Sequence, residues 1–391
     1  MSRWVVAGVA GLVLFLGGGL LFWMRAQDVP AAGKAVTVVN LARSGCGDGW
    51  TRARPGEQTL QVHNTDSVTA DAALIDPTSG AIFGELEGLA AGQTGELRVT
   101  LGNGTYALRC LPDGADATVG PRVVVAGGPD RPGPAAVVPV TPGDLIGPLK
   151  AYHDYVAAGL GTLADETSAL ARTVASGDRP AAQAAWSTAH LSYGRLGAAY
   201  GAFGDAGKAI DGTADGLPGG TGDPDFTGFH RLEHGLWHDE PMPALAGVAD
   251  ALDGQVRALR DSAAGLRIDP ADLVTRAHEI SEDALQSELT GRTDYGSGTG
   301  VASALAGLDG TREVLNVLRP VLIPRLPELS EVDAAVTRAE TALGAARRPD
   351  GSWTPVTRLD RGLRERADGA LGALAERLAV VAAVAEPRRT S

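Results

Sequence analysis

Residues 127–143 divide the chain, because this segment cannot continue either a helix or a central strand. Five prolines stand among its glycines, and each lacks the backbone N–H that helices and sheets use: Pro129, Pro132, Pro134, Pro139 and Pro142. We therefore expect a semi-rigid linker. The hydrophobic pattern differs on its two sides, and 391 residues exceed one average domain, so the sequence predicts a multidomain chain.

Residues 35–126 have the short, turn-separated pattern of an all-β domain. Apolar and β-branched residues favour strands in four segments: 36–39, 59–62, 96–101 and 123–125. Clusters of glycine, proline and aspartate mark turns between them. Strands at this spacing predict a β-sandwich.

Residues 144–386 change to a helical period. Leucines and tyrosines recur every three to four residues from Leu145 to Leu170, and Arg179-Pro180 opens a second helix. A loop rich in glycine, aspartate and proline covers 212–227. Further helices are expected near 228–238, 242–263, 270–290, 299–318, 330–346 and 357–384. The pattern predicts an all-α helical bundle.

Residues 1–25 determine the expected compartment. An apolar run from Trp4 to Trp23 lies between Arg3 and Arg25, and about 20 such residues span a bilayer. The length favours an uncleaved transmembrane anchor over a cleaved signal peptide. In either case we expect the rest of the chain at the cell membrane on its extracytoplasmic side, periplasmic or cell-surface.

The net charge and the cysteines bear on the protein's partners and on its compartment. The net charge of -13 argues against nucleic acid as a partner, because phosphate binding needs a basic surface. Cys46 and Cys110 are the two cysteines, and a pair in an exported domain most often forms a disulfide.

Three of the seven histidines lie between His230 and His238. On a helix, His230, Glu233 and His234 share one face, and an imidazole with a carboxylate three residues away can chelate one cation. Asp211 belongs to the acidic region before this helix. We predict a metal site at His230 and Glu233, completed by Asp211 and His234. A solvated polar helix face is the alternative.

The same residues match His-x-x-Glu-His, the inverted zinc-peptidase pattern. In that interpretation His230 and His234 bind zinc and Glu233 is the general base. A distant carboxylate would complete the site: Glu282, Glu288 or Glu313. His190, by contrast, is expected to be an ordinary residue of an amphipathic helix.

The stretch Thr227-Gly228-Phe229-His230-Arg231-Leu232-Glu233 resembles the signature of the imelysin-like family. Other stretches agree along about 140–385, among them 189–193, 202–205, 209–211, 278–286 and 289–291. A cupredoxin-like domain joined to an imelysin-like domain resembles the EfeO-type components of bacterial iron-uptake systems. That resemblance implies a non-enzymatic protein that binds iron, as Fe2+ or Fe3+, through the His-x-x-Glu pair, with zinc or manganese as other candidates.

The resemblance also implies partners: a membrane iron permease, and a secreted haem peroxidase. Imelysin itself has been classed as a peptidase, so a zinc metallopeptidase is the alternative function, and a scaffold that has lost metal binding is another.

The chain departs from the family pattern at several positions. Gly194 and Gly197 stand where relatives often carry glutamate, Gly207 where aspartate is common, and His234 where lysine is usual. The cupredoxin-like part contains His63 but no methionine, so its copper ligand set is incomplete. We interpret this part as structural or partner-binding.

Overall fold

The computed structural model describes residues 37–130 and 136–390. The segment 1–25, predicted to be an anchor or a signal peptide, lies outside the described residues. Of the helices that are described, none combines the length and the apolar character needed to cross a membrane.

The N-terminal part begins with a three-stranded sheet. Strand β1 (Thr37–Leu41) pairs in parallel with β2 (Gly56–Asn64), and β2 pairs antiparallel with β5 (Thr94–Leu101). Leu60 lies opposite Leu97 in this register, and both side chains are buried. The sheet therefore has one apolar face that needs a partner.

A second sheet supplies that partner. Its strands run in the order β4 (Ile82–Leu89), β3 (Ala70–Ile75), β6 (Gly104–Pro112) and β7 (Thr118–Val119), and β8 (Val123–Val125) also pairs with β6. Apolar side chains of both sheets form one core: Val39, Leu41, Leu60, Val62, Leu74, Leu97, Val99, Leu101, Tyr106 and Leu108.

The two cysteines lie in this core. Cys46, in the loop after β1, forms a disulfide with Cys110 on β6, so the loop is joined covalently to the second sheet. Trp50, in the same loop, is buried against the same core.

Helices make up the C-terminal part. They are α1 (Ile146–Ser176), α2 (Arg179–Gly194), α3 (Tyr200–Asp211), α4 (Gly228–Trp237), α5 (Met242–Asp261), α6 (Pro270–Asp283), α7 (Gly300–Leu322), α8 (Leu329–Gly344) and α9 (Arg361–Ala385). The predicted order of β sheets followed by an all-helical part is confirmed. Helix α3 was not expected from the hydrophobic pattern, and it contains a kink at Gly204.

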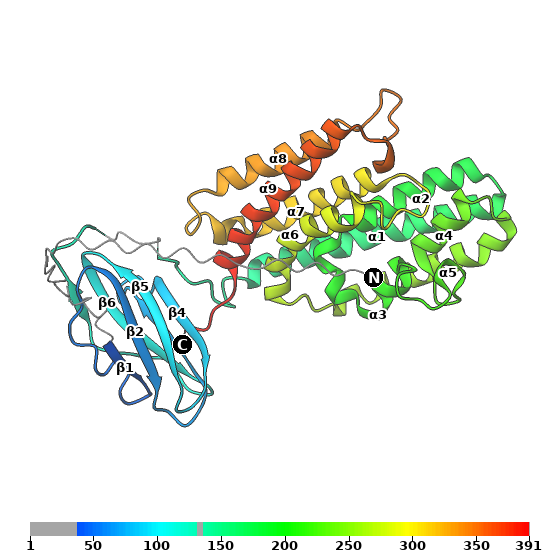
Figure 1. Ribbon diagram of the computed structural model, residues 1–391. Coiled ribbons are helices and arrows are strands. Elements are labelled where there is room, and N and C mark those ends of the chain that lie inside the picture. Colours follow the sequence, from blue (N-terminus) through cyan, green and yellow to red (C-terminus); the bar gives the residue numbers. More distant parts are fainter. Residues whose placement is uncertain (1–36, 131–135, 391) are drawn as a thin grey trace, which may run out of the picture.

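Local chemistry explains where several helices begin. The side chains of Asp178, Asp269 and Asp360 accept hydrogen bonds from backbone N–H groups in the first turns of α2, α6 and α9. Once formed, α1 lies against α2 and α5, while α9 lies against α6 and α8 (Figure 1). The short helix α4 packs against α2 and α5, so its buried face lies inside the bundle.

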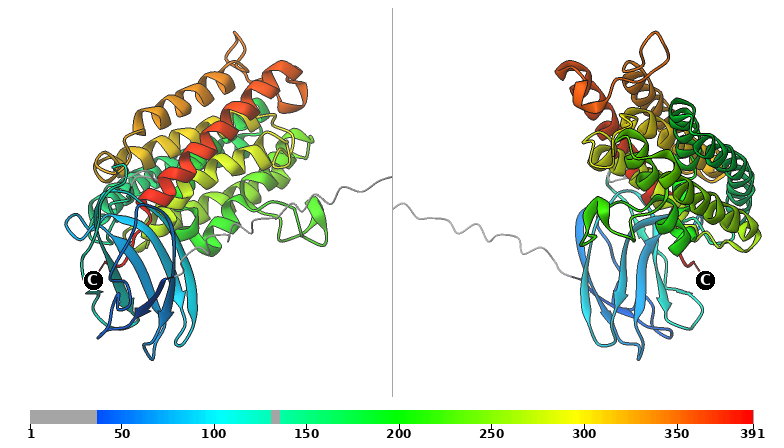
Figure 2. Two further views of the ribbon diagram at one scale, coloured as in Figure 1. Left: turned by 60° about the vertical axis from the view of Figure 1, so that its left-hand side comes forward. Right: turned by 90° about the vertical axis from the view of Figure 1, so that its right-hand side faces the viewer.

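The β part lies at one end of the helical bundle in each view of the molecule (Figures 1 and 2). The predicted linker contacts both parts, since Val137 forms a β-bridge with Ile82 and Val140 forms one with Pro387. The C-terminal segment returns to the sheets, where Arg388 pairs with Glu85 at 3.1 Å.

We predict that opening the disulfide destabilises the β part selectively. A closed loop with a sequence separation of 64 contributes about 4 kcal/mol in the chain-entropy model. In a Cys46→Ser, Cys110→Ser double variant, the urea transition reported by β-part signals should move to lower concentration, while the transition of the helical far-ultraviolet signal should stay in place. An unchanged β transition would contradict this contribution.

Candidate metal centre

His190 is held in the wall of the site by aromatic packing. Its ring stacks on Trp186, one turn earlier on α2, with centroids 4.6 Å apart. The indole Nε1–H of Trp186 donates to the Phe229 carbonyl at 2.9 Å, which fixes the stack against α4. His190 is therefore a buried residue with a set orientation rather than a free surface side chain.

A glycine lets α4 begin directly against the end of α3. Gly228 has φ of 73°, and a Cβ there would lie 2.1 Å from the Ile210 carbonyl oxygen. Only glycine fits this approach and this backbone conformation. Thr227 adds a hydrogen bond from Oγ1 to the Ala209 carbonyl at 3.1 Å. This junction brings Asp211 at the end of α3 beside His230 in the first turn of α4.

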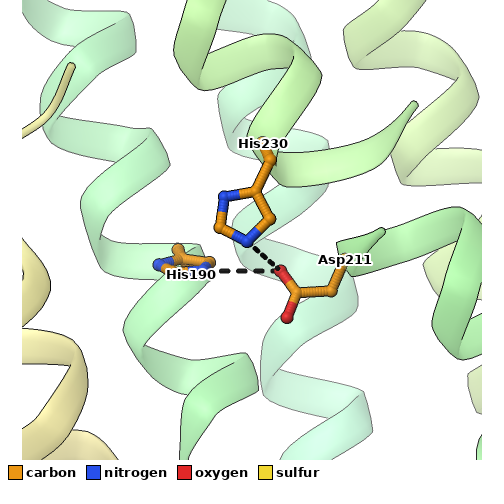
Figure 3. A group of neighbouring side chains, drawn as sticks. All are labelled: His190, Asp211 and His230. Carbon is orange, nitrogen blue, oxygen red and sulfur yellow. Dashed lines mark ion pairs between the residues drawn. The ribbon is translucent and has the colours of Figure 1, made fainter. Parts of the chain in front are cut away.

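Three side chains from three helices converge at this junction (Figure 3). Asp211 Oδ1 lies 3.4 Å from His190 Nε2 and 3.6 Å from His230 Nε2. One possible ligand atom from each residue lies within 4.8 Å of the other two. Among the described residues, this is the one cluster in which three or more histidine, cysteine, aspartate or glutamate side chains could hold a metal ion. Both histidines are buried, and Asp211 is partly buried.

Two polar atoms of the cluster lack a hydrogen bond. Asp211 Oδ1 and His190 Nδ1 are buried, and no described residue hydrogen-bonds to either. Leaving a buried polar atom unpaired is costly, so such atoms need an explanation. A cation between the carboxylate and the two imidazoles would give Asp211 Oδ1 its missing partner.

Glu233 orients His230 from the opposite side of the ring. Its Oε2 lies 3.2 Å from His230 Nδ1, and its Oε1 accepts the backbone N–H groups of Tyr295 and Ser297 at 3.0 Å each. Both carboxylate oxygens are thus engaged, and the side chain is 1% exposed. Glu233 therefore lies behind His230, whereas the helical spacing predicts that it shares the ion with His230.

His234 lies outside the cluster. Its Nδ1 is 3.2 Å from Glu240 Oε1, and its ring stacks on His238. Of the four predicted ligands, the structure therefore brings together Asp211 and His230, with Glu233 one contact away. It adds His190, for which the sequence predicts only an ordinary place on an amphipathic helix.

A further carboxyl group lies near the cluster. Burial raises the pKa of Glu288, in the short π-helical turn after α6, and its carboxyl interacts with the charges of His190, His230 and Asp211. Glu288 is one of the three carboxylates that the zinc-peptidase pattern offers as a distant ligand.

Gly194 and Gly197, two of the glycines that depart from the family pattern, face other parts of the bundle. A Cβ at Gly194 would meet Ala306 at 3.4 Å, and one at Gly197 would meet Ile280 at 3.3 Å. These contacts belong to α7 and α6. The cluster described above is therefore built without either position.

The carboxylates control the charge of His230. Burial opposes a charge on this imidazole, but Asp211 and Glu233 outweigh burial and raise the pKa of His230 to about 8. Burial likewise opposes a charge on Glu233, yet the bond to His230 keeps the pKa of Glu233 below its usual range. In the absence of a metal, the pair is thus a buried imidazolium–carboxylate contact at neutral pH.

Residues 148–381 match the protein family described as Imelysin. The curated relatives include "Iron uptake system component EfeO" of Yersinia pseudotuberculosis serotype I (strain IP32953), 30% identical over 328 residues, 83% of this chain and 84% of the relative. The protein of that name from Yersinia pestis is 30% identical over 329 residues, with the same coverage of 83% and 84%. The one from Escherichia coli O1:K1 / APEC is 32% identical over 238 residues, 60% of this chain and 63% of the relative.

We predict that Gly228→Ala separates α3 from α4. The added Cβ would collide with the Ile210 carbonyl, and a left-handed alanine alone costs on the order of 1–3 kcal/mol. The variant should unfold at lower urea concentration than the wild type. Gly247→Ala on α5 is the matched control, since its Cβ would meet nothing within 4 Å. Equal losses of stability in both variants would refute the close-approach argument.

We predict that His230 titrates near pH 8 in the metal-free protein. Because this pKa lies above the roughly 6.5 of an unfolded histidine, protonated His230 stabilises the fold below about pH 6.5. That contribution is lost as the pH rises through about 8. NMR of the imidazole Cε1 proton follows the titration, and Asp211→Asn should lower the pKa by removing a charge. A wild-type pKa at or below that of an unfolded histidine would contradict the arrangement.

Proposed function

The chain belongs to the imelysin family and is an EfeO-type protein, and from this premise we propose that it is an iron-uptake component that binds one Fe2+ ion at His190, Asp211 and His230. The ion is the cargo of the protein rather than a resident cofactor. The observation that most strongly supports this proposal is the position of Asp211 Oδ1. This buried oxygen faces two imidazole nitrogens and has no hydrogen-bond partner among the described residues.

The spacing of the three donors supports an ion between them. Imidazole nitrogens bind transition metals at roughly 2.1 Å, so neighbouring donors around one ion lie about 3 to 3.5 Å apart. The distances from Asp211 Oδ1 to His190 Nε2 and His230 Nε2 are 3.4 and 3.6 Å. The ligand atoms of the three residues lie within 4.8 Å of one another, so the side chains would move closer together to hold a metal.

The chemistry of the donors favours iron in its ferrous state. Two imidazoles and one carboxylate with open positions are typical of non-haem Fe2+ sites. Zinc and manganese accept the same donors, so selectivity would also depend on supply. Glu288 would supply a further negative charge when its carboxyl group loses its proton in the presence of a cation.

Glu233 would act on the ion through His230. A carboxylate bonded to the far nitrogen of a histidine fixes the ring and strengthens it as a ligand. Glu233 also accepts hydrogen bonds from the backbone N–H groups of Tyr295 and Ser297. These bonds tie the loop after η4 (Ala284–Glu288) to the site. Loading and release of the ion would therefore be coupled to this loop.

The zinc-peptidase alternative finds little support in this geometry. A general base needs an oxygen that can reach a water molecule, but both oxygens of Glu233 are engaged. The second zinc ligand of that motif, His234, pairs with Glu240 instead. The relatives' names likewise describe a component of an uptake system, in agreement with the prediction of a non-enzymatic protein.

This function would operate outside the cytoplasmic membrane, where the protein would pass iron to a membrane permease. A secreted haem peroxidase would be a third component. The disulfide between Cys46 and Cys110 supports an oxidising compartment. The cupredoxin-like β part would serve as a structural or partner-binding domain. His63, its one histidine, bonds Thr94 through Nδ1.

We predict that the full-length protein binds Fe2+ without oxygen and that His190→Ala, Asp211→Ala and His230→Ala each weaken binding roughly a hundredfold or more. Glu233→Gln should cost less, about 10- to 100-fold, because it acts behind a ligand. His63→Ala in the β part is the control and should change nothing. Binding that survives both His190→Ala and Asp211→Ala would favour the scaffold alternative or a site elsewhere. Peptide cleavage that depends on Glu233 would favour the peptidase.

A further inference from the structure

Two loops that lie far apart in the sequence meet beside the metal centre. The 212–227 loop joins α3 to α4, so it begins directly after Asp211. The 289–299 loop joins η4 to α7 and reaches His230, because the ring of Tyr295 lies against the His230 ring with centroids 5.2 Å apart. Each loop therefore adjoins one of the proposed ligands of the ion.

Tyr295 joins the two loops to each other. Its phenol oxygen accepts a hydrogen bond from the Ala214 backbone N–H at 2.8 Å. Its ring also packs on Phe226, near the other end of the 212–227 loop, with centroids 5.1 Å apart. Burial raises the pKa of Tyr295, so the phenol is neutral at physiological pH. One side chain of the 289–299 loop thus contacts both ends of the other loop.

An ion pair joins the same two loops closer to solvent. Arg292 Nε lies 2.9 Å from Asp215 Oδ2, and both side chains are more than half exposed. Exposed ion pairs contribute little stability by themselves and are weakened by salt. This contact can therefore break and form again without disturbing the helices.

Glycines give both loops the freedom to move. In the 212–227 loop, Gly216 and Gly220 have φ of 84° and 56°, and in the 289–299 loop Gly291 has φ of 73°. Glycine adopts these left-handed values readily, and a few loop residues that change φ and ψ are enough for a hinge. A Cβ added at any of these three positions would meet nothing within 4 Å, so close packing does not hold them.

We propose that the 212–227 and 289–299 loops form a gate over the metal centre, held closed by the Tyr295 and Arg292 contacts. The loops part to admit or release the ion and close again over the buried ligands. This inference rests on the proposed function. Lids of this kind shield a site from water and set the rate at which a bound group enters and leaves.

The exposure of the ligands indicates where the ion would enter. The side chain of Asp211 is 21% exposed, whereas those of His190 and His230 are 10% and 5% exposed. Asp211 is therefore the ligand closest to solvent, and the 212–227 loop begins at the next residue. Separation of the loops would uncover Asp211 first.

A gate of this kind changes rates rather than affinity. The Tyr295 hydroxyl and the Arg292 guanidinium bond the opposite loop, and neither bonds a proposed ligand of the ion. A latch that is equally stable in the empty and the loaded protein shifts no binding equilibrium. It instead slows entry and release by the same factor, which distinguishes a gate from a further ligand.

The test is stopped-flow binding of Zn2+ alone and, without oxygen, of Fe2+ alone to the full-length protein. Tyr295→Phe keeps the ring but removes the acceptor of the Ala214 N–H, so association and dissociation should both become roughly fivefold faster at an unchanged dissociation constant. Tyr155→Phe is the matched control, since it removes a hydroxyl bond to the Arg195 carbonyl, and it should change neither rate. A change in only one of the two rates would overturn the gate.

A charge exchange tests the second contact. Arg292→Asp places two carboxylates opposite each other, so dissociation of the ion should become faster. Added negative charge alone would slow the release of a cation, so faster release reports separation of the loops. Combining Arg292→Asp with Asp215→Arg should restore the wild-type rate. Unchanged rates in both Tyr295→Phe and Arg292→Asp would overturn the proposal.

Failure of the gate can be told apart from failure of the proposed function. If the wild type binds neither ion, the proposed function is wrong, and amide hydrogen exchange of the metal-free protein then decides whether the latch exists. The Ala214 N–H keeps its acceptor in Arg292→Asp, so faster exchange of this amide would report parting of the loops. Exchange as slow as in the wild type would overturn the latch.

Discussion

A carboxylate placed between two buried imidazoles is the contact on which the rest of this site depends. Asp211 faces His190 and His230 with an oxygen that has no hydrogen bond among the described residues. Such a group is stable in a protein interior only if a charge or a cation compensates it. Protonation of His230 provides one compensation and a metal ion the other, so proton and ion compete for the same place.

The bundle is arranged to hold that contact. Trp186 stacks on His190 and bonds the start of α4, and Gly228 allows α4 to touch the end of α3. Glu233 then fixes His230 from behind and fastens the loop that carries Tyr295. Each proposed ligand thus comes from a helix, while the loop would be the element that responds to binding or release of an ion.

The order of a β part followed by a helical part, and most of the helices, could be predicted, because hydrophobic period and turn residues are local properties of sequence. The site was predicted only in part. His230, Glu233 and Asp211 stand in or near a recognisable motif, but His190 comes from another helix and reaches the cluster only through tertiary packing. The role of Glu233 depended on backbone N–H groups far along the chain, and no helical spacing reveals such partners. His234 had the right spacing, yet the turn at Asp239 brought Glu240 to it and left it outside the centre.

The most direct measurement is a crystal structure of the Fe2+-loaded protein, grown without oxygen, with anomalous data collected on both sides of the iron edge. The account predicts its strongest anomalous peak between His190 Nε2, Asp211 and His230 Nε2, with Glu233 still bonded to the far nitrogen of His230. A strongest peak bound directly by Glu233, or located away from Asp211, would contradict it.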